Sequence, residues 1–447
     1  MRHHLSMVGI GRRRLLVPAL FAVLALTLAA CHSPGSQSSG GTSGTIKIGF
    51  ISPVTGTTAA SGIEMLNGWK LYWKLNPNTV AGRKIQWTSE DDAGDLNTGL
   101  QKARKLVEQN GDKVLVGPLL ANVSYAIAQY LSTQPNVVGL NPVASADDLS
   151  QRKAVKNYVR TGGWQSSTPP QVAGDWAYQQ GYRKAITLCN DYAFGQESCG
   201  GFINTFTDHG GKIVKSLWSP LGTTDYSSYL AQINPKDADV VFITTVGADS
   251  VRVIKGWSQF GLKGKIPLIG QETTLEQSLI RAMGDAAVGL QSFGHYAEGR
   301  DDPMTQSFDT AYEQEYHLIP SYYACAAYTA GQWFSQALTQ TGGDLSNVGK
   351  FTDVLRSIKL TDSCLGPVQL DSHGGTVFNV YLRQVAKDSQ GRDYNKVLKT
   401  FPNTSQFYWY KPDAFLAQPV YSRQYLGQNW PTSCDAYVTG KCPSQSQ

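Results

Sequence analysis

The regular alternation of short apolar segments with amphipathic segments constrains the fold of this chain most strongly. Residues 45–51 (TIKIGFI) form an apolar run of strand type, and residues 63–75 carry apolar side chains at helical spacing. The alternation continues in a first series up to about residue 140 and in a second series from residue 185 to residue 293. Strands separated by helices of 10–15 residues are typical of parallel sheets in α/β proteins. Two such series predict two similar lobes.

The pattern also locates the individual elements and the break between the lobes. The expected strands span residues 45–51, 84–87, 113–116, 137–140, 185–188, 213–217, 240–244, 267–269, 289–293, 366–370 and 376–385. The expected helices include residues 63–75, 98–109, 124–132, 304–316, 323–339 and 348–358. Glycines at 162–163 interrupt the pattern, and the aromatic-rich tail beyond residue 399 is expected to be irregular.

The N-terminal segment has the three-part layout of an export signal. Arg12–Arg14 form a basic head, Leu15–Leu28 an apolar core, and Ala29-Ala30-Cys31 a small-residue cleavage site. A cysteine at this point resembles a bacterial lipobox, so Cys31 is expected to carry a lipid and to become the first mature residue. The alternative is an uncleaved membrane anchor, but an apolar core of about 14 residues is short of the roughly 20 that a spanning helix needs. Paired arginines also leave export by the twin-arginine route open.

Charge argues against a nucleic-acid partner. The chain has 39 basic and 34 acidic residues, and removal of the signal with its four arginines (Arg2, Arg12, Arg13, Arg14) leaves 35 basic residues. A mature protein so close to neutral has no basic stripe with which to neutralise phosphates. Residues 31–44 are rich in Ser and Gly and are expected to tether the folded body to the membrane surface.

Six further cysteines are expected to form disulfides in the oxidising compartment that an export signal implies. They are Cys189, Cys199, Cys325, Cys364, Cys434 and Cys442. Six cysteines allow 15 pairings, and the sequence does not choose among them. Short spacing favours Cys189–Cys199 and Cys434–Cys442, which leaves Cys325–Cys364. The spacing does not match a metal site.

The sequence lacks the common catalytic constellations. It has no nucleophile elbow, no His-Glu-x-x-His motif and no phosphate loop, since the segment GLKGK at 261–265 is followed by Ile266. We therefore expect a protein that is not an enzyme and that needs no cofactor or metal.

Several segments together resemble the type I periplasmic binding proteins of the leucine/isoleucine/valine-binding branch, the solute-binding components of ABC importers. The segments are residues 48–56 (IGFISPVTG), 91–95 (DDAGD), 116–118 (VGP), 223–226 (TTDY), 237–240 (DADV) and 366–370 (GPVQL). Their order and spacing carry the resemblance, which covers about residues 45–385. It implies two doubly wound parallel-sheet lobes joined by a hinge of three crossovers, with the ligand between them.

The export signal, the Ser/Gly segment and the resemblance together give the expected domain boundaries. Residues 1–30 are expected to be the signal and 31–44 the tether, and residues 45–161 with 296–364 to form lobe 1. Residues 162–295 with 365–400 form lobe 2, and residues 401–447 form a C-terminal wrap.

Aligned positions imply where lobe 1 contacts a ligand. In the family, a small hydroxyl residue and the N–H groups of a helix start grip the ligand carboxylate. The matching residues here are Ala121, which lacks the hydroxyl, and Asn122. A second grip aligns with the backbone of Val143 and with Ser145, which keeps a hydroxyl.

Lobe 2 supplies the remaining expected contacts. Glu272 aligns with the acid that pairs with the ligand's ammonium group, although a Glu at this position also suits a capping role before the next helix. Two positions that are tyrosines in the amino-acid binders align with Phe194 and Val246. Tyr192 is close enough in sequence to Phe194 to supply the tyrosine missing at that position. A bulky aromatic position aligns with Ser61. These changes leave room for a larger or flatter ligand than a branched-chain amino acid.

The resemblance implies a lipid-anchored, extracytoplasmic solute-binding protein of an ABC importer. It is expected to be a monomer that captures an amino acid or an amino-acid-like molecule by hinge closure and passes it to permease subunits. An amide or urea-like compound and an aromatic carboxylate are the alternative ligands, and a ligand-sensing receptor domain is the alternative function.

Overall fold

The computed structural model describes residues 44–427, 431 and 433–443. The predicted signal segment, Cys31 and all of the tether except Gly44 lie outside the described residues. In the part of the chain that the structure describes, no helix is both long and apolar enough to cross a membrane.

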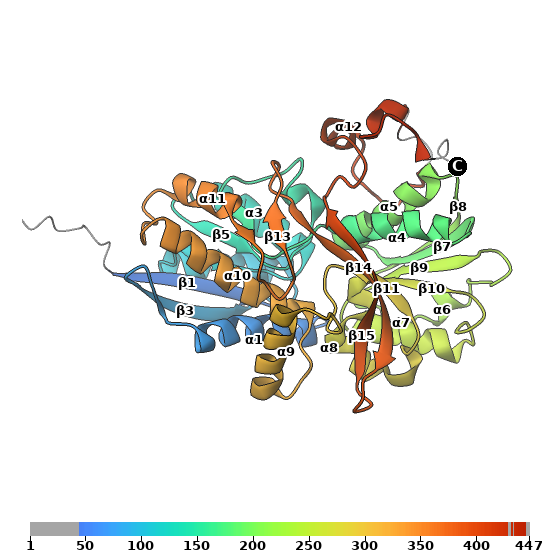
Figure 1. The fold of residues 1–447 in the computed structure, drawn as a ribbon, viewed down its shortest axis with the longest axis horizontal. Helices are drawn as coiled ribbons and strands as arrows, with labels where there is room; N and C mark the ends of the chain where they lie inside the picture. Colours follow the sequence, from blue (N-terminus) through green and yellow to red (C-terminus); the bar gives the residue numbers. More distant parts are fainter. Residues whose placement is uncertain (1–43, 428–430, 432, 444–447) are drawn as a thin grey trace, which may run out of the picture. The chain divides into compact units, whose positions relative to one another are not determined.

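The first lobe is built on a six-stranded sheet with the order β2-β3-β1-β4-β5-β6 (Figure 1). All neighbours pair in parallel except β2, which pairs antiparallel with β3. The strands are β1 (Thr45–Ser52), β2 (Thr79–Val80), β3 (Arg83–Asp91), β4 (Val114–Val116), β5 (Val138–Asn141) and β6 (Tyr158–Arg160). The central strands are buried on both faces, which explains their continuous apolar runs.

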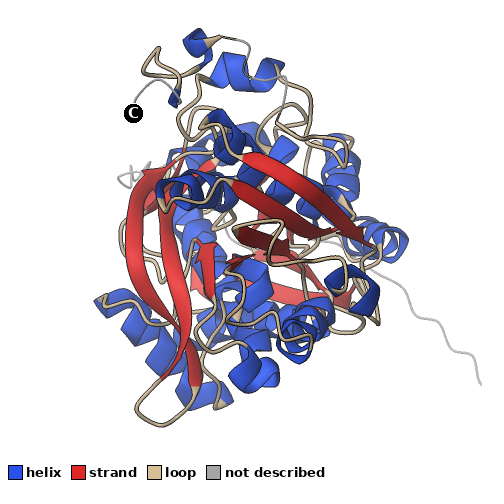
Figure 2. Ribbon diagram, turned by 90° about the vertical axis from the view of Figure 1, so that its right-hand side faces the viewer, coloured by secondary structure: helices blue, strands red, loops and turns tan. Residues whose placement is uncertain are grey.

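The second lobe is built on a nine-stranded mixed sheet, in which β8, β7, β9, β10 and β11 are parallel neighbours. Two long antiparallel strands, β14 and β15, curve along its edge (Figure 2). The strands are β7 (Lys184–Asn190), β8 (Lys212–Ser219), β9 (Val240–Thr244), β10 (Leu268–Gln271), β11 (Gln291–Gly294), β12 (Lys359–Leu360), β13 (Val368–Leu370), β14 (Thr376–Lys387) and β15 (Asp393–Thr404).

The helices connect these strands and pack on the sheets. They are α1 (Ala59–Leu75), α2 (Leu96–Arg104), α3 (Ala121–Ser132), α4 (Thr168–Gln179), α5 (Ala193–Asp208), α6 (Ser227–Leu230), α7 (Ala248–Gln259), α8 (Gln277–Met283), α9 (Pro303–Tyr316), α10 (Tyr322–Gln340), α11 (Val348–Ser357) and α12 (Pro412–Ala417). Single turns of other helix types occur at η1 (Lys105–Gln109), η2 (Asp147–Leu149), η3 (Glu272–Leu275), η4 (Gly284–Ala286) and η5 (Cys434–Ala436). The predicted two-lobe α/β architecture is confirmed.

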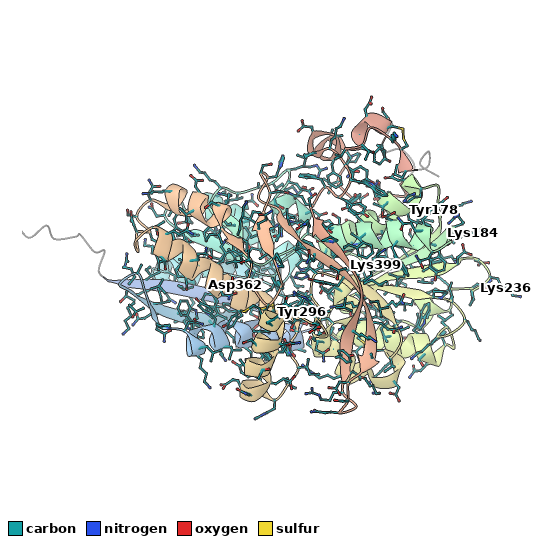
Figure 3. The ribbon with its side chains drawn as sticks, viewed as in Figure 1. Tyr178, Lys184, Lys236, Tyr296, Asp362 and Lys399 are labelled. Carbon is teal, nitrogen blue, oxygen red and sulfur yellow. A yellow bond between two sulfur atoms is a disulfide. The ribbon has the colours of Figure 1, made fainter. Side chains whose placement is uncertain are left out.

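The chain passes between the lobes three times. It first leaves β6 for α4, then returns after β11 to α9, α10 and α11, and finally crosses back through β12 and β13, which join the second sheet by pairing with β14. The second passage places α10 directly on α1, because Gly68 has no side chain: a Cβ there would lie 1.9 Å from the carbonyl oxygen of Ala324. The same passage contains Tyr296 (Figure 3), whose hydroxyl donates to Asp309 at 2.9 Å.

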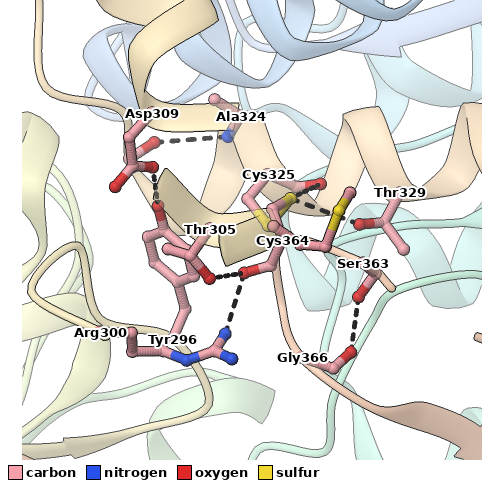
Figure 4. Close-up of a disulfide and its surroundings, with 12 residues drawn as sticks. Tyr296, Arg300, Thr305, Asp309, Ala324, Cys325, Thr329, Ser363, Cys364 and Gly366 are labelled. Carbon is pink, nitrogen blue, oxygen red and sulfur yellow. Dashed lines mark hydrogen bonds between the residues drawn. A yellow bond between two sulfur atoms is a disulfide. The ribbon is translucent and has the colours of Figure 1, made fainter. Parts of the chain in front are cut away.

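A disulfide fixes the third passage to lobe 1. Cys325 in α10 is bonded to Cys364, which precedes β13 (Figure 4). The carbonyl oxygen of Cys364 also accepts hydrogen bonds from Arg300 and Thr305, both at 3.0 Å. The crossing segments are therefore tied to one another as well as to α10.

The other two disulfides are Cys189–Cys199, between β7 and α5, and Cys434–Cys442 in the C-terminal segment. The three bonds follow the pairing that the spacing favours.

The C-terminal segment departs from the expectation of an irregular wrap from residue 401. Residues 393–404 form β15, a twelve-residue strand paired with β14. Its polar, largely exposed sequence does not show the apolar alternation of a strand; it pairs with β14 along one edge and makes only an isolated bridge, Lys396 with Gly299, on the other. β6 was also missed, because it has only three residues.

Beyond β15, the described part of the C-terminal segment (residues 405–427, 431 and 433–443) contacts both lobes. An aromatic cluster of Phe407, Tyr410, Phe415, Tyr421 and Tyr437 forms its centre. The hydroxyl groups of Tyr410 and Tyr421 bond to Asp208 and Asn204 of α5 in lobe 2. From lobe 1, Arg152 donates to three carbonyl oxygens of this segment, at residues 415, 416 and 418.

Candidate functional site

A cavity lies where the carboxyl ends of the parallel strands of both lobes meet the crossing segments. In open α/β sheets, this edge is the usual place for ligands. The lining residues are Leu119, Leu120, Ala121, Val143, Ser145, Trp164, Tyr192, Phe194, Val246, Thr273, Tyr322 and Tyr323. Lobe 1 supplies the first five, lobe 2 supplies Tyr192, Phe194, Val246 and Thr273, and the crossings supply the rest.

The cavity is narrow in this structure. Its volume is about 20 Å³, close to the minimum of about 10–15 Å³ that one water molecule requires. Ligand pockets usually measure about 300–1,000 Å³. Binding of a solute therefore requires the lobes or the lining side chains to move apart first.

The N-terminus of α3 forms one polar wall. The helix begins at Ala121, and its N-cap residue Leu120 provides no side-chain hydrogen bond. The first N–H groups of an α-helix have no intrahelical partners and carry a partial positive charge. The buried start of α3 is therefore suited to an anionic group, and the missing hydroxyl at Ala121 does not remove this property.

Further hydrogen-bond donors come from the loop after β5 and from the first crossing. Ser145 Oγ lies 3.1 Å from Ser166 Oγ. Trp164 is 1% exposed, and its Nε1 has no hydrogen-bond partner among the described residues. Arg160 holds the segment in place, because its guanidinium donates to the carbonyl oxygens of Ala144 at 3.0 Å and Trp164 at 2.7 Å.

Aromatic rings form the other walls. Trp164 meets Phe194 and Tyr322 edge to face, with ring centroids 5.9 and 6.0 Å apart. Tyr192 lies 5.9 Å from Phe194, and Tyr322 lies 3.9 Å from Tyr323. Such surfaces favour a flat, apolar ligand body.

Charge is absent from this lining. Among the described residues that line the cavity, none has an acidic or basic side chain. The polar side chains of the lining residues carry hydroxyl groups and one indole N–H. An ammonium group in the cavity would therefore have no carboxylate against it.

Glu272 was expected to supply that carboxylate, but the structure gives it other partners. It is fully buried, and its carboxylate accepts hydrogen bonds from the backbone N–H groups of His295 and Tyr296, both at 3.1 Å. It also bonds to Nδ1 of His295 and, at 3.1 Å, to Nη1 of Arg383. Thr273, the next residue, is the one that lines the cavity.

These partners determine the ionisation of Glu272. Burial raises its pKa, but His295 and Arg383 favour the charged form more strongly, so the pKa lies below its usual value. The carboxylate is thus ionised and surrounded by protein donors, a geometry that leaves an ammonium ligand no free face.

The structure brings most of the other expected contacts together. Ala121, Val143, Ser145, Tyr192, Phe194 and Val246 all line the cavity. Asn122 lies in the first turn of α3 but outside the lining, and Ser61 Oγ instead lies 3.3 Å from Ser278 Oγ between α1 and α8. Whether the six lining residues touch a ligand stays a prediction.

Sequence reasoning missed six lining residues: Leu119, Leu120, Trp164, Thr273, Tyr322 and Tyr323. One signal was available for Trp164, because it directly follows the two glycines that mark the break between the lobes. An aromatic residue in a crossing between two lobes is placed to meet both of them.

The lobes also contact each other beside the cavity. Glu64 of α1 is 2% exposed and forms an ion pair with Arg281 of α8. Its second oxygen accepts from the backbone N–H of Ser321 at 3.1 Å. At a further contact, the N–H of Ala248 donates to the carbonyl oxygen of Thr57 at 3.1 Å. This structure therefore has the two lobes in direct contact.

Comparison with known proteins agrees with this arrangement. The family model described as periplasmic binding protein matches residues 45–391. A protein of Brucella melitensis biotype 1, called Leu/Ile/Val-binding protein homolog 6, is 28% identical over 368 residues, which cover 80% of this chain and 91% of that protein.

Two solved structures are similar in both fold and sequence. The solute-binding protein of an ABC transporter from Rhodopseudomonas palustris BisB5, in complex with 3,4-dihydroxybenzoic acid, has a TM-score of 0.76 and 28% identity. The match covers 80% of this chain and 98% of the R. palustris protein. A second R. palustris solute-binding protein, in complex with benzoate, has a TM-score of 0.74 and 25% identity, with 80% and 98% covered.

The family implies an extracytoplasmic location. The match over most of the chain, the two-lobe fold and the cavity between the lobes lead to one conclusion: this chain belongs to the periplasmic binding protein family, in its leucine/isoleucine/valine-binding branch, and is a solute-binding protein of an ABC transporter.

Proposed function

We propose that this protein captures an aromatic carboxylate between its lobes and delivers it to the permease of an ABC importer. The observation that carries the proposal is the uncharged, donor-rich and aromatic lining of the cavity, together with the complete pairing of Glu272 inside the protein. The start of α3, with Ser145 and the indole N–H of Trp164, is suited to a carboxylate. The aromatic rings of the walls are suited to the ring of the ligand.

The similar proteins support this ligand class. Two solute-binding proteins of comparable fold are in complex with 3,4-dihydroxybenzoic acid and with benzoate. The second candidate is a branched-chain amino acid, favoured by the name of the Brucella relative. It requires a partner for the ammonium group, which the lining does not provide.

In the proposed mechanism, the ligand first meets one lobe, and hinge closure then surrounds it with both. A ligand shifts the equilibrium towards the closed form only through the additional contacts it makes there. We infer that the present structure, with its lobes in contact and a cavity of about 20 Å³, is a closed form without ligand. The permease would recognise the closed form in which the lining has made room for the ligand.

The ligand class is tested by thermal unfolding and calorimetry of the mature protein. Benzoate and 3,4-dihydroxybenzoate are compared with leucine, isoleucine, valine and simple amides. A true ligand at a hundredfold excess over its dissociation constant stabilises the fold by about 2.7 kcal/mol. Stabilisation by the aromatic acids alone is expected, whereas stabilisation by leucine alone would show that the amino-acid candidate is correct.

We further propose that Cys31 carries the lipid that holds the protein at the outer face of the cell membrane. Metabolic labelling with a fatty acid should mark the wild-type chain and leave Cys31→Ser unlabelled. Equal labelling of both chains would exclude this attachment site.

A further inference from the structure

Beyond the ligand class, a chain of buried contacts leads from Glu272 to the wall of the cavity. Glu272 bonds to Nδ1 of His295, and the imidazole ring of His295 stacks on Trp164 with centroids 5.1 Å apart and an interplanar angle of 17°. Tyr322, another wall residue, meets the same imidazole edge to face at 5.1 Å. His295 itself does not line the cavity. It lies behind the two rings that do.

The Glu272 end of this series of contacts is also held in place. Arg383 of β14 is fully buried and donates to Glu272 Oε1 at 3.1 Å, to the Tyr296 carbonyl oxygen at 2.7 Å and to Ser292 Oγ at 3.0 Å. Gly294 makes room for the carboxylate, because a Cβ at this position would lie 2.4 Å from Cδ of Glu272. The carboxylate therefore has one defined position beneath the imidazole.

We propose that Glu272 is a positioning residue for the ligand site, which acts through His295 to hold Trp164 in the wall of the cavity. The acid that the family alignment assigns to an ammonium group serves here to orient an aromatic wall. This role deepens the proposed function, because a fixed indole face with a free N–H selects a flat ligand with an acceptor group. The ligand class thus depends on a residue that the ligand does not touch.

A buried donor and acceptor pair is needed for this orientation. Without the hydrogen bond to Glu272, the imidazole can rotate about its side-chain bonds, and the stack on Trp164 loses its fixed partner. Since the indole is 1% exposed, its position depends on the rings packed against it. The Trp164 indole would then still line the cavity, but in more than one orientation.

The first test needs no ligand. The fluorescence of Trp164 is isolated as the difference between each protein and its Trp164→Phe partner, in the wild-type and in the Glu272→Gln background. The expected result is a red-shifted and more easily quenched Trp164 signal in Glu272→Gln. An unchanged difference spectrum would overturn the positioning role, whatever the ligand is.

The second test is a double-mutant cycle with benzoate as the probe. Glu272→Gln should weaken binding about tenfold in the wild-type background, which corresponds to about 1.4 kcal/mol, and less than about twofold when Trp164 is already Phe. Equal losses in both backgrounds would show that Glu272 acts by another route. Failure of benzoate to bind the wild-type protein would count against the proposed function alone, since the fluorescence test still decides the positioning role.

Glu298→Gln is the matched control. Glu298 is also a buried carboxyl group close to Arg383, but its hydrogen bond goes to the backbone N–H of Asn395 at 3.1 Å and not to His295. This variant should leave the Trp164 spectrum and benzoate affinity unchanged. If it reproduces the effects of Glu272→Gln, a general disturbance of the buried groups near Arg383 explains them, and the proposal fails.

Discussion

Replacement of Arg281 by Met tests whether the contact between the lobes contributes to ligand affinity. Arg281 on α8 forms an ion pair with Glu64 on α1, so the pair joins lobe 2 to lobe 1. Glu64 is buried, and Glu276 adds a second acidic group nearby, which burial and the charge of Glu64 both drive towards a pKa well above its usual value. The variant leaves Glu64 without its cation when the lobes are together.

The size of the expected loss follows from how deeply the Glu64–Arg281 pair is buried. Removal of one partner of a fully buried pair costs about 3–5 kcal/mol. The Arg281 side chain is 35% exposed, so water replaces part of the lost interaction, and we expect a loss of about 1.5–2.5 kcal/mol. We expect both groups to reach water when the lobes separate, so that the loss applies to the closed form only. Ligand affinity should therefore fall by roughly ten- to sixtyfold.

Isothermal calorimetry with the ligand that the screen identifies measures this loss. Lys102→Met is the matched control, because Lys102 pairs with Glu90 at 2.7 Å entirely within lobe 1. The ligand affinity of Lys102→Met should remain within about twofold of wild type, because this partly exposed pair does not join the lobes. An unchanged dissociation constant in Arg281→Met, or an equal change in Lys102→Met, would refute the reasoning that the pair stabilises closure.

Two further predictions concern stability. Burial raises the pKa of Glu298 to about 7, against about 4.3 in an unfolded chain, so the native protein keeps this proton to higher pH. The stabilisation is complete below pH 4.3 and is lost as the pH rises to 7, so urea unfolding should show wild type losing up to about 3 kcal/mol more than Glu298→Gln over this range. A parallel pH dependence of the two proteins would contradict this. Cys325 and Cys364 are 39 residues apart, so replacing both by Ala should lower the free energy of unfolding by about 3–4 kcal/mol in denaturant titrations, and a change below about 1 kcal/mol would show that the crossing needs no covalent tie.

The fold was predictable because its central strands are buried on both faces. Segments such as residues 240–244 and 114–116 are apolar throughout, and local sequence alone marks them as core strands. β15 was not predictable in this way, because its stability depends on pairing with β14, and its own side chains are mostly polar and exposed. Such pairing depends on the partner strand β14 as much as on the sequence of β15 itself.

The candidate site shows the same division. Ala121, Val143 and Ser145 follow strand ends, and residues at strand ends of an α/β sheet can be assigned to one edge from the sequence. The partners of Glu272 could not be assigned, because Arg383 lies 111 positions away on an antiparallel strand. The alignment thus located the correct segment, but it did not reveal which groups hydrogen-bond to the Glu272 carboxylate.

The C-terminal segment has a practical consequence for the design of shortened variants. The family match ends at residue 391, yet Arg152 holds the backbone of residues 415–418 while Tyr410 and Tyr421 grip α5. A protein trimmed to the family boundary would keep every wall of the cavity. It would lose the brace that spans both halves, so recombinant versions intended for binding studies should extend through Cys442.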